Sequence, residues 1–411
     1  MTPTLHKVYN QYGSQDTASR AIREGGEIIV EFRQYGKTGR QVSIIGLGCE
    51  YLDRKPYEQV KETIDTALDL GVNLFDVFMP GKEVRENIAK ALGKNREKVM
   101  IQGHIGSTDV NTMYDISRDL PTVKRYFEDM LRIFGGYIDF GFMFYIDSEE
   151  DFKGVFETGF AEYVQHLKKE GYIGHIGFSS HDPEMAIRTI NTGLPEVMMF
   201  SINPAFDMMP LSKYALDSIE SEQWAQLFRG VDPARTRLYE LCEEKQIGIT
   251  AMKAFGSGKL LSPDFTPFVR PLTTAQLIHY ALDTPCVASV LPGCKNAAEM
   301  IDAANYLKTS QAERDYTEII SNVRKDFRGS CVYCSHCQPC PEEIDIAMVH
   351  RYLDIARIRP DNLPPDLRKH YSKLNKGADA CTACGHCEQR CPFDVPVIAN
   401  MRDAAKLLDK R

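Results

Sequence analysis

The stretch KGVFETGFAEYVQHLKKEGYIGHIGFSSHDPEMAIRTINTGLPEVMMFSIN, residues 153–203, decides the fold. It holds two short apolar runs, YIGHIGFS (172–179) and EVMMFSIN (196–203), and each run follows a segment with apolar residues at helical spacing. Short apolar runs of this kind predict buried strands, and the segments before them predict amphipathic helices. Strands that alternate with helices are typical of a parallel sheet.

The same alternation continues on both sides of this stretch. The other expected strands are SIIGLG (43–48), VNLFD (72–76), KVMIQGH (98–104), YIDFGFMF (137–144), IGITAMK (247–253) and VASVLPG (287–293). The expected helices lie near 57–70, 83–92, 121–134, 153–169, 183–191, 233–245, 273–283 and 296–307. Ahead of them, EIIVEFRQYGKTGRQVSII predicts a hairpin around a Gly-Lys-Thr-Gly turn. Strand–helix pairs in this number predict an α/β fold, a (β/α)8 TIM barrel over residues 27–310.

An open doubly wound sheet is the alternative fold, and it needs a Gly-rich fingerprint after the first strand. The sequence GLGCEYL at that place lacks the G-x-G-x-x-G spacing, which favours the barrel.

Eight of the twelve cysteines form two runs near the C-terminus. The first is Cys331, Cys334, Cys337 and Cys340, followed by Pro341, and the second is Cys381, Cys384, Cys387 and Cys391, followed by Pro392. In the ferredoxin pattern, three cysteines of a run bind one [4Fe–4S] cluster and the fourth binds the other cluster. We therefore expect a small α-helical ferredoxin-like domain with two [4Fe–4S] clusters, preceded by a linker helix, over residues 311–411.

The crossed pattern gives one cluster to Cys331, Cys334, Cys337 and Cys391, and the other to Cys381, Cys384, Cys387 and Cys340. The first run is one residue shorter before its last cysteine, so the crossed assignment is less certain there.

Zinc binding and disulfide bonds are the alternatives to iron–sulfur clusters for these cysteines. Zinc prefers four ligands from two separated pairs, often with histidine, whereas His336 and His386 stand at positions that face away in a ferredoxin-type loop. A disulfide framework is typical of short secreted chains.

Composition narrows the class of protein. The chain has 411 residues, 43% of them hydrophobic and 26% charged, with a net charge of −8. Nucleic acid is not an expected partner, because phosphate binding needs a basic surface. The first residues show no signal peptide, and no stretch reaches the roughly 18 apolar residues of a membrane span. We expect a cytoplasmic protein from an anaerobic host, with an N-terminal extension (1–26) and a long insertion (204–232) that contains Trp224.

Chemistry in this fold takes place where the strands end. Asp76 and His104 end neighbouring strands, and a histidine polarised by a carboxylate is a general acid or base near neutral pH. A structural His–Asp pair is the alternative. Glu50, Asp147 and His181 also lie at strand ends, although an exposed loop histidine is more often idle. Cys49 and Cys294 are expected to be small core residues.

Two Gly-bearing loops follow the seventh and eighth strands, where barrels commonly bind phosphate. They contain Gly256 and Gly258 after Lys253, and Gly293 before Lys295. Tight turns without a ligand are the alternative.

Several segments resemble the aldo/keto reductases: GKTGRQVSIIGLG, GVNLFD, GYIGHIGFSSH, FSINP, GITAMKAFGSGKL and VLPGCKN, in that order. The cysteine tail resembles the iron–sulfur branch of this family. The resemblance covers about residues 30–400 and implies a TIM barrel. It also implies hydride exchange between NADPH and a carbonyl through Asp, Tyr, Lys and His.

The resemblance carries over unevenly to individual residues. Asp76 matches the family aspartate, but Gly81, His104 and Phe144 stand at the positions of the tyrosine, lysine and histidine. Tyr145 is the residue that could supply a phenol in place of the lost tyrosine. Ser179 and Asn203 stand at nicotinamide-binding positions, while Met199 and Met252 replace the family glutamine and ring-stacking aromatic. Glu299 replaces an arginine that binds the extra phosphate of NADPH, which makes NAD(H) more compatible than NADP(H).

Three functions remain open. The first is an iron–sulfur oxidoreductase with a small-molecule site at the barrel mouth and a redox partner such as a ferredoxin or a flavoprotein. The second is an NAD(H)-dependent carbonyl reductase with structural clusters. The third is a non-catalytic electron-transfer or docking subunit of a complex. We favour the first hypothesis.

Overall fold

The structure is a computed structural model that describes residues 30–110, 113–207, 233–320, 337–358, 365–391 and 393–409, together with residues 329, 331, 333, 335 and 363. The expected N-terminal extension, residues 208–232 of the insertion, Cys334 and His336 lie outside the described residues. None of the helices in the described ranges has the combination of length and apolar character needed to span a lipid bilayer.

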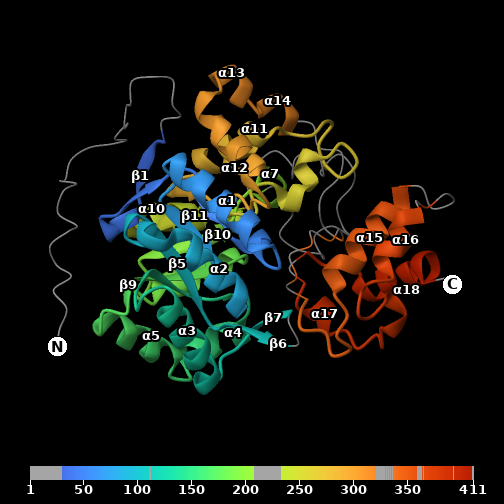
Figure 1. The fold of residues 1–411 in the computed structure, drawn as a ribbon, viewed down its shortest axis with the longest axis horizontal. Helices are drawn as coiled ribbons and strands as arrows, with labels where there is room; N and C mark the ends of the chain where they lie inside the picture. The colour runs from blue at the N-terminus through green and yellow to red at the C-terminus, as the bar shows by residue number, and fades with distance from the viewer. Residues whose placement is uncertain are drawn as a thin grey trace.

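A curled parallel sheet forms the centre of the molecule (Figure 1). Its strands are β3 (Leu47–Gly48), β4 (Leu74–Val77), β5 (Met100–Ile105), β8 (Ile138–Met143), β9 (Ile173–Ser180), β10 (Val197–Ser201), β11 (Gly248–Met252) and β12 (Val287–Val290). Each strand pairs in parallel with the next one in this order. Parallel bridges Ile45↔Val290 and Gly48↔Gly293 join the two edges. This closure is consistent with a (β/α)8 barrel, and all eight expected strands are confirmed.

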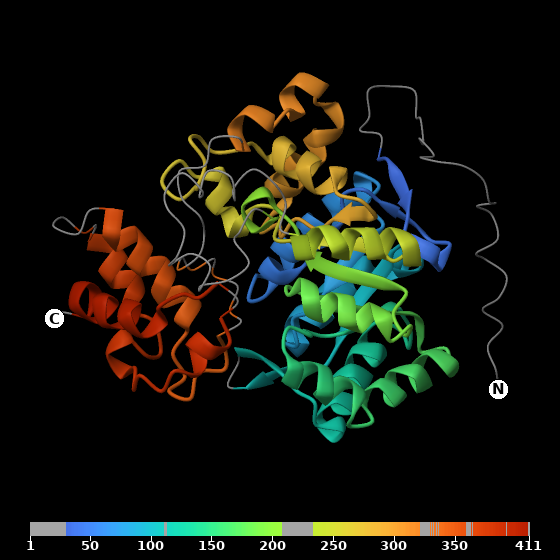
Figure 2. The same ribbon diagram turned by 180° about the vertical axis from the view of Figure 1, so that it is seen from behind.

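Helices surround the sheet in the expected order (Figure 2). They are α1 (Tyr57–Asp69), α2 (Lys82–Leu92), α3 (Leu120–Ile133), α4 (Glu149–Phe156), α5 (Phe160–Lys169), α6 (Pro183–Asn191), α10 (Pro233–Lys245), α11 (Thr274–Asp283) and α12 (Ala297–Ala304). Their buried faces and the outer faces of the strands form one apolar core. A second, smaller core lies among the inward-facing residues of the strands and includes Tyr35, Phe140 and Phe142.

Smaller elements complete the barrel. The expected hairpin is confirmed as β1 (Phe32–Gln34) paired antiparallel with β2 (Gln41–Ser43) around the 3-10 turn η1 (Gly36–Thr38). Other short elements are the 3-10 turns η2 (Glu50–Leu52), η3 (Gly93–Lys98), η4 (Gly256–Leu261) and η5 (Asn305–Lys308), and the helix α7 (Pro204–Asp207).

The structure differs from the sequence-based expectation in three places. A hairpin of β6 (Ser107–Val110) and β7 (Met113–Ile116) follows β5 and was not predicted. The helix expected over 153–169 is two helices, because α4 ends at Phe156 and Gly159, with a left-handed backbone (φ 83°), is the N-cap at which α5 begins. Within 311–320, the expected linker helix is two single turns, α13 (Gln311–Arg314) and α14 (Thr317–Ile320), separated by Asp315 in an extended conformation.

The C-terminal segment, meaning the described residues from 329 to 409, is helical. It consists of α15 (Ile346–Ile358), α16 (Pro365–Tyr371), η6 (Ala378–Ala380), α17 (His386–Gln389) and α18 (Val397–Leu408). Both ribbon views place it beside the barrel on the side toward which the β6–β7 hairpin projects (Figures 1 and 2). Its apolar residues share a core with Phe206, Leu260 and Leu272 of the barrel loops. Because α7 follows β10 and η4 follows β11, this shared core lies at the strand ends that form the barrel mouth.

Candidate active site and cysteine cavity

A polar pair lies inside the barrel at the expected position. His104 Nε2 is 2.8 Å from Asp76 Oδ1, and Gln102 Nε2 donates to the same oxygen at 2.8 Å. Below them, the Tyr35 hydroxyl donates to Gln102 Oε1 at 3.2 Å. Asp76 is 3% exposed and His104 is 2% exposed. The predicted contact between Asp76 and His104 is therefore confirmed, and the pair is deeply buried.

Aromatic rings enclose His104 on its other sides. The ring centroids of Phe142 and Phe144 are 5.4 and 5.3 Å from that of His104, and Phe78 is 6.1 Å away. His104 Nδ1 has no hydrogen-bond partner among the described residues. A buried polar atom without a partner is costly, so this nitrogen is a point where a ligand or water would be stabilised.

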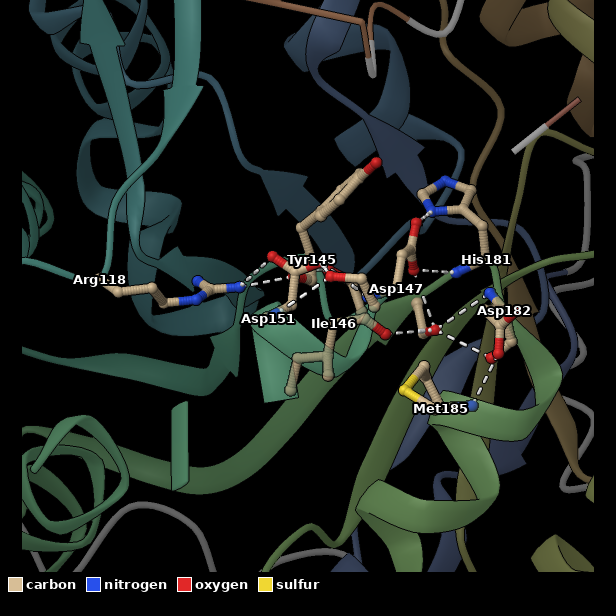
Figure 3. A network of polar contacts seen from close by, with 11 residues as sticks. Arg118, Tyr145, Ile146, Asp147, Asp151, His181, Asp182 and Met185 are labelled. Carbon is tan, nitrogen blue, oxygen red and sulfur yellow. Dashed lines mark hydrogen bonds and ion pairs between the residues drawn. The ribbon is translucent and has the colours of Figure 1, made fainter. Parts of the chain in front are cut away.

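A second His–Asp pair lies nearer the mouth, in the loops after β8 and β9 (Figure 3). His181 Nδ1 is 2.9 Å from Asp147 Oδ2, and the His181 backbone N–H donates to Asp147 Oδ1 at 2.6 Å. The Ser180 hydroxyl donates to the same Oδ1 at 3.0 Å. The side chains are 6% and 9% exposed, so the expectation that His181 is an exposed loop histidine is wrong.

The protonation of this pair follows from its surroundings. Burial lowers the pKa of His181, and the positive charges of Lys253 and Arg235 act in the same direction against the attraction of Asp147. For Asp147, burial works against ionisation, but the charge and hydrogen bonds of His181 and Ser180 outweigh it and lower the carboxyl pKa. Near neutral pH the pair is thus a carboxylate and a neutral imidazole. Nδ1–H of His181 then donates to Asp147, and Nε2 is the basic atom.

Tyr145 lies beside this second pair rather than beside Asp76 and His104. Its ring centroid is 5.8 Å from that of His181, whereas Phe144 is the residue that packs on His104. Tyr145 has a left-handed backbone (φ 59°), which turns the chain out of β8. Its backbone makes two hydrogen bonds. The N–H donates to Ser179 Oγ at 2.8 Å, and the carbonyl accepts from Arg118 at 2.6 Å (Figure 3).

Two further charged residues, Lys253 and Glu50, lie at the barrel mouth. Lys253, at the end of β11, is half-buried and has a left-handed backbone (φ 58°). Glu50, at the start of η2, is half-buried as well. Burial raises the pKa of Glu50, the charge of Lys253 opposes this, and the charge of Asp76 adds to it. Lys253 therefore acts electrostatically on both Glu50 and His181, which places one cation among the acid–base groups.

The two predicted nicotinamide-binding residues make hydrogen bonds within the protein. Ser179 is 2% exposed, and its hydroxyl accepts the Tyr145 N–H. Asn203 is fully buried, donating to the Lys253 carbonyl at 2.9 Å and accepting the Phe206 N–H at 2.9 Å. Both side chains thus fix the backbone at the strand ends.

The two loops that were predicted to bind phosphate also make contacts with other residues of the protein. A Cβ at Gly293 would meet the Tyr51 ring at 2.7 Å, so the ring covers this glycine. The Lys295 N–H donates to Glu299 Oε2 at 2.8 Å, which puts the protein's own carboxylate at the N-terminus of α12, where an anion is favoured. In the other loop, Gly256 (φ 53°) and Gly258 (φ 87°) make a tight turn before Lys259. Lys259 is 5% exposed and pairs with Asp354 of α15 at 3.2 Å.

A cavity in the C-terminal segment brings the two cysteine runs together. Cys337 and Cys340 of the first run line it together with Cys381, Cys384 and Cys387 of the second. Its empty volume is about 360 Å³, which includes space open to solvent. His386, expected to face away, lines it as well. In the described part of the chain, no three His, Cys, Asp or Glu side chains are close enough together to hold a single metal ion. The cysteines are instead distributed around the wall of the cavity.

Backbone amides approach the sulfurs outside the cavity. The Tyr333 N–H donates to Cys331 Sγ at 3.4 Å. Burial raises the pKa of Cys391, and the backbone N–H groups of Phe393 and Val395 act against this rise. Donors of this kind stabilise a thiolate, the form in which cysteine binds a metal. Cys331 and Cys391 do not line the cavity, and both are partly buried against the core shared with the barrel.

The sequence did not single out the Asp147–His181 pair as a site. The available signal was an aspartate shortly after the fourth strand and the Ser-Ser-His ending of the fifth, since neighbouring strand ends meet at the barrel mouth. Cys49 and Cys294 are 2% exposed, as expected for core residues.

Comparisons with known proteins agree with this fold. A putative aldo-keto reductase from Pseudomonas aeruginosa shares 21% identity, with a TM-score of 0.51 over 67% of this chain and 95% of that chain. An aldo-keto reductase from Bacillus halodurans, in its holo form, shares 18% identity, with a TM-score of 0.54 over 72% of this chain and 98% of that one. At these identities the likeness concerns the fold alone. A comparison with curated proteins found no match. The profile described as the aldo/keto reductase family matches residues 44–265, more than half of the chain. The chain therefore belongs to the aldo/keto reductase family.

Proposed function

We propose that this protein is an iron–sulfur oxidoreductase, with a small-molecule site at the barrel mouth and two [4Fe–4S] clusters in the C-terminal segment. The observation that carries the proposal is the cavity in which Cys340 joins Cys381, Cys384 and Cys387. These are the four residues that the crossed ferredoxin pattern assigns to one cluster. Of the residues that the pattern assigns to the other cluster, Cys337 also lines this cavity, whereas Cys331 and Cys391 do not. When bound, such clusters supply single-electron transfer.

The mouth supplies acid–base chemistry in this proposal. With Nδ1–H donated to Asp147, His181 accepts or returns a proton at Nε2. Lys253 offers a cation to a carbonyl or carboxylate oxygen, and Tyr145 forms an aromatic wall next to His181. Asp76 and His104 lie deeper, and we assign them to holding the floor of the site through Gln102 and Tyr35. This assignment replaces the expectation that Asp76 and His104 are the acid–base pair.

Metal analysis tests the clusters. Protein purified without oxygen should contain about eight irons and eight sulfides per chain. Cys340→Ser should lower the iron content substantially, whereas Cys286→Ser, at a half-buried cysteine of the barrel, should leave it unchanged. Zinc in place of iron, or equal iron in both variants and the wild type, would contradict the proposal.

Turnover measurements test the proposed acid–base role of His181 at the barrel mouth. The assay is anaerobic oxidation of reduced methyl viologen in the presence of aldehydes, ketones and enoates. His181→Gln should slow turnover about a hundredfold or more, while the exposed control His166→Gln should not change it. Asp76→Asn and His104→Gln are measured in parallel. Loss of turnover in these two with an active His181→Gln would return the acid–base role to the deeper pair.

An NAD(H)-dependent carbonyl reductase is the second candidate, and the family match over residues 44–265 favours it. Against it stand the internal contacts of Ser179, Asn203 and Lys295. Titration with NADH separates the two functions, because a dinucleotide site requires saturable quenching of the protein fluorescence. Saturation below millimolar NADH would favour the second candidate over the first.

A further inference from the structure

Two side chains of the C-terminal segment contact the loops at the barrel mouth, and each lies two residues after a cysteine. Tyr333 follows Cys331, and its ring centroid is 4.6 Å from Lys259 Nζ in η4. Phe393 follows Cys391, and its ring centroid is 4.9 Å from that of Phe206 in α7. Cys331 and Cys391 are therefore close in sequence to the contacts that join the segment to the barrel.

The cysteines of the cavity lie differently. Cys384 is exposed, and its neighbours Thr382 and Ala383 are exposed as well. Cys331 and Cys391 do not line the cavity, although, like Cys340 and Cys381, they are partly buried against the core that the segment shares with the barrel. We call Cys340, Cys381, Cys384 and Cys387 the outer group, and Cys331 and Cys391 the inner group; Cys337 lines the cavity as well. Cys384 gives the outer group a side exposed to solvent, while each member of the inner group is two residues from a side chain that contacts the mouth.

A buried ion pair crosses the boundary beside the inner group. Lys259 Nζ is 3.2 Å from Asp354 Oδ2, and the Tyr333 hydroxyl donates to the same oxygen at 2.6 Å. Lys259 is 5% exposed, and the side chain of Asp354 is 19% exposed. Burial and the charge of Asp354 both raise the pKa of Tyr333, so its hydroxyl remains a donor. Charges removed from water in this way interact with their surroundings more strongly than surface charges do.

Resting on the proposed function, we infer that Lys259 and Asp354 are positioning residues that hold the inner group at the barrel mouth, and that their charges act on the redox centre bound there. Tyr333 links the two, because its hydroxyl meets Asp354 and its N–H meets Cys331 Sγ. A centre that gains negative charge on reduction is stabilised by a nearby cation and destabilised by a nearby anion. In the intact pair, the two effects oppose each other.

The test uses the complete anaerobic protein and a redox titration followed by EPR. Lys259→Gln leaves Asp354 unpaired, so one of the two reduction potentials should become more negative. Asp354→Asn leaves Lys259 unpaired, so the same potential should become more positive. The double variant should return it toward the wild-type value, and Lys259→Arg, which keeps the charge, should leave it nearly unchanged. The other potential should move less in every case.

Asp403→Asn is the matched control, because Asp403 pairs with Arg357 of α15 at 2.8 Å on the exposed surface of the same segment. It should shift neither potential. Opposite shifts in the two single variants separate a charge effect from a structural one, since mere loosening would move the potential in the same direction in both. Shifts of one sign, or none, in variants that retain wild-type iron would overturn the inference. Wild-type protein without iron would contradict the proposed function instead.

Discussion

Replacing Asp147 with asparagine should destabilise the protein while preserving its fold. Asp147 accepts three hydrogen bonds, from His181 N, His181 Nδ1 and Ser180 Oγ. An asparagine oxygen still accepts from the His181 N–H and the Ser180 hydroxyl, but its amide group faces Nδ1 and cannot accept there. The loss is one hydrogen bond to a charged acceptor and the charge assistance of two others. A hydrogen bond to a charged group contributes about 1.5–3 kcal/mol, so we expect a loss of about 2 kcal/mol.

Urea unfolding followed by far-UV circular dichroism, without oxygen and at pH 7.5, measures this effect. The control is Asp182→Asn on the same loop. Asp182 is the N-cap of α6 and accepts the Met185 N–H at 2.7 Å, a role in which asparagine is about equally effective. Its unfolding midpoint should stay within error of the wild type. The reasoning is refuted if Asp147→Asn unfolds at the same urea concentration as the wild type and Asp182→Asn.

Three further predictions concern charge, burial and packing. Burial lowers the pKa of His181, so between that lowered pKa and about 6.5 the unfolded chain binds more protons than the folded one. Stability should therefore increase with pH there, by at most about 1.4 kcal/mol per pH unit from this residue, and His181→Gln should reduce the difference between urea midpoints at pH 5.5 and 7.5. Asp207 is 1% exposed and accepts from Arg235, Tyr239 and Tyr280. Asp207→Asn leaves the guanidinium without a counter-charge and should cost about 3–5 kcal/mol in thermal or urea unfolding, with Tyr280→Phe costing less. Gly293→Ala should destabilise by about 1–3 kcal/mol, because its Cβ would meet the Tyr51 ring at 2.7 Å, whereas Gly81→Ala, with its nearest contact at 3.4 Å, should be neutral or slightly stabilising in the same assay.

The order of strands and helices was predictable from periodicity, because apolar runs and helical spacing are local properties. Run 98–104 became β5 (Met100–Ile105), and segment 183–191 became α6 with the predicted bounds. The β6–β7 hairpin was missed although Ser107–Val110 and Met113–Ile116 are two short segments of strand length. The division at Gly159 depends on a single left-handed residue, and periodicity alone does not reveal such a residue.

Contacts within the site were predictable from the sequence only where the two residues lie on neighbouring strands. Asp76 and His104 end adjacent strands, so their contact followed from topology. The contact of Asp147 with His181 joins two loops 34 residues apart, and its closest bond is to a backbone N–H. The types of side chain in the sequence do not predict such a hydrogen bond to a backbone N–H. Tyr145 shows the same limit, because its left-handed backbone moves its ring away from the line of β8.

The positions at the mouth that were expected to bind a dinucleotide make contacts within the protein. Ser179 accepts the Tyr145 N–H, Asn203 bonds to the backbone of Lys253 and Phe206, and Glu299 accepts the Lys295 N–H. Each of these side chains or loops was expected to contact a dinucleotide. The loop after β11 differs from the others, because its Lys259 pairs with Asp354 in the C-terminal segment. We infer that attachment of this segment competes with phosphate binding at the loop after β11, since Lys259 cannot hold both a phosphate and Asp354. The full chain with Asp354→Asn tests this competition. If Lys259 becomes available to a phosphate, NADH binding should increase over the wild type; unchanged binding would show that the inference is wrong.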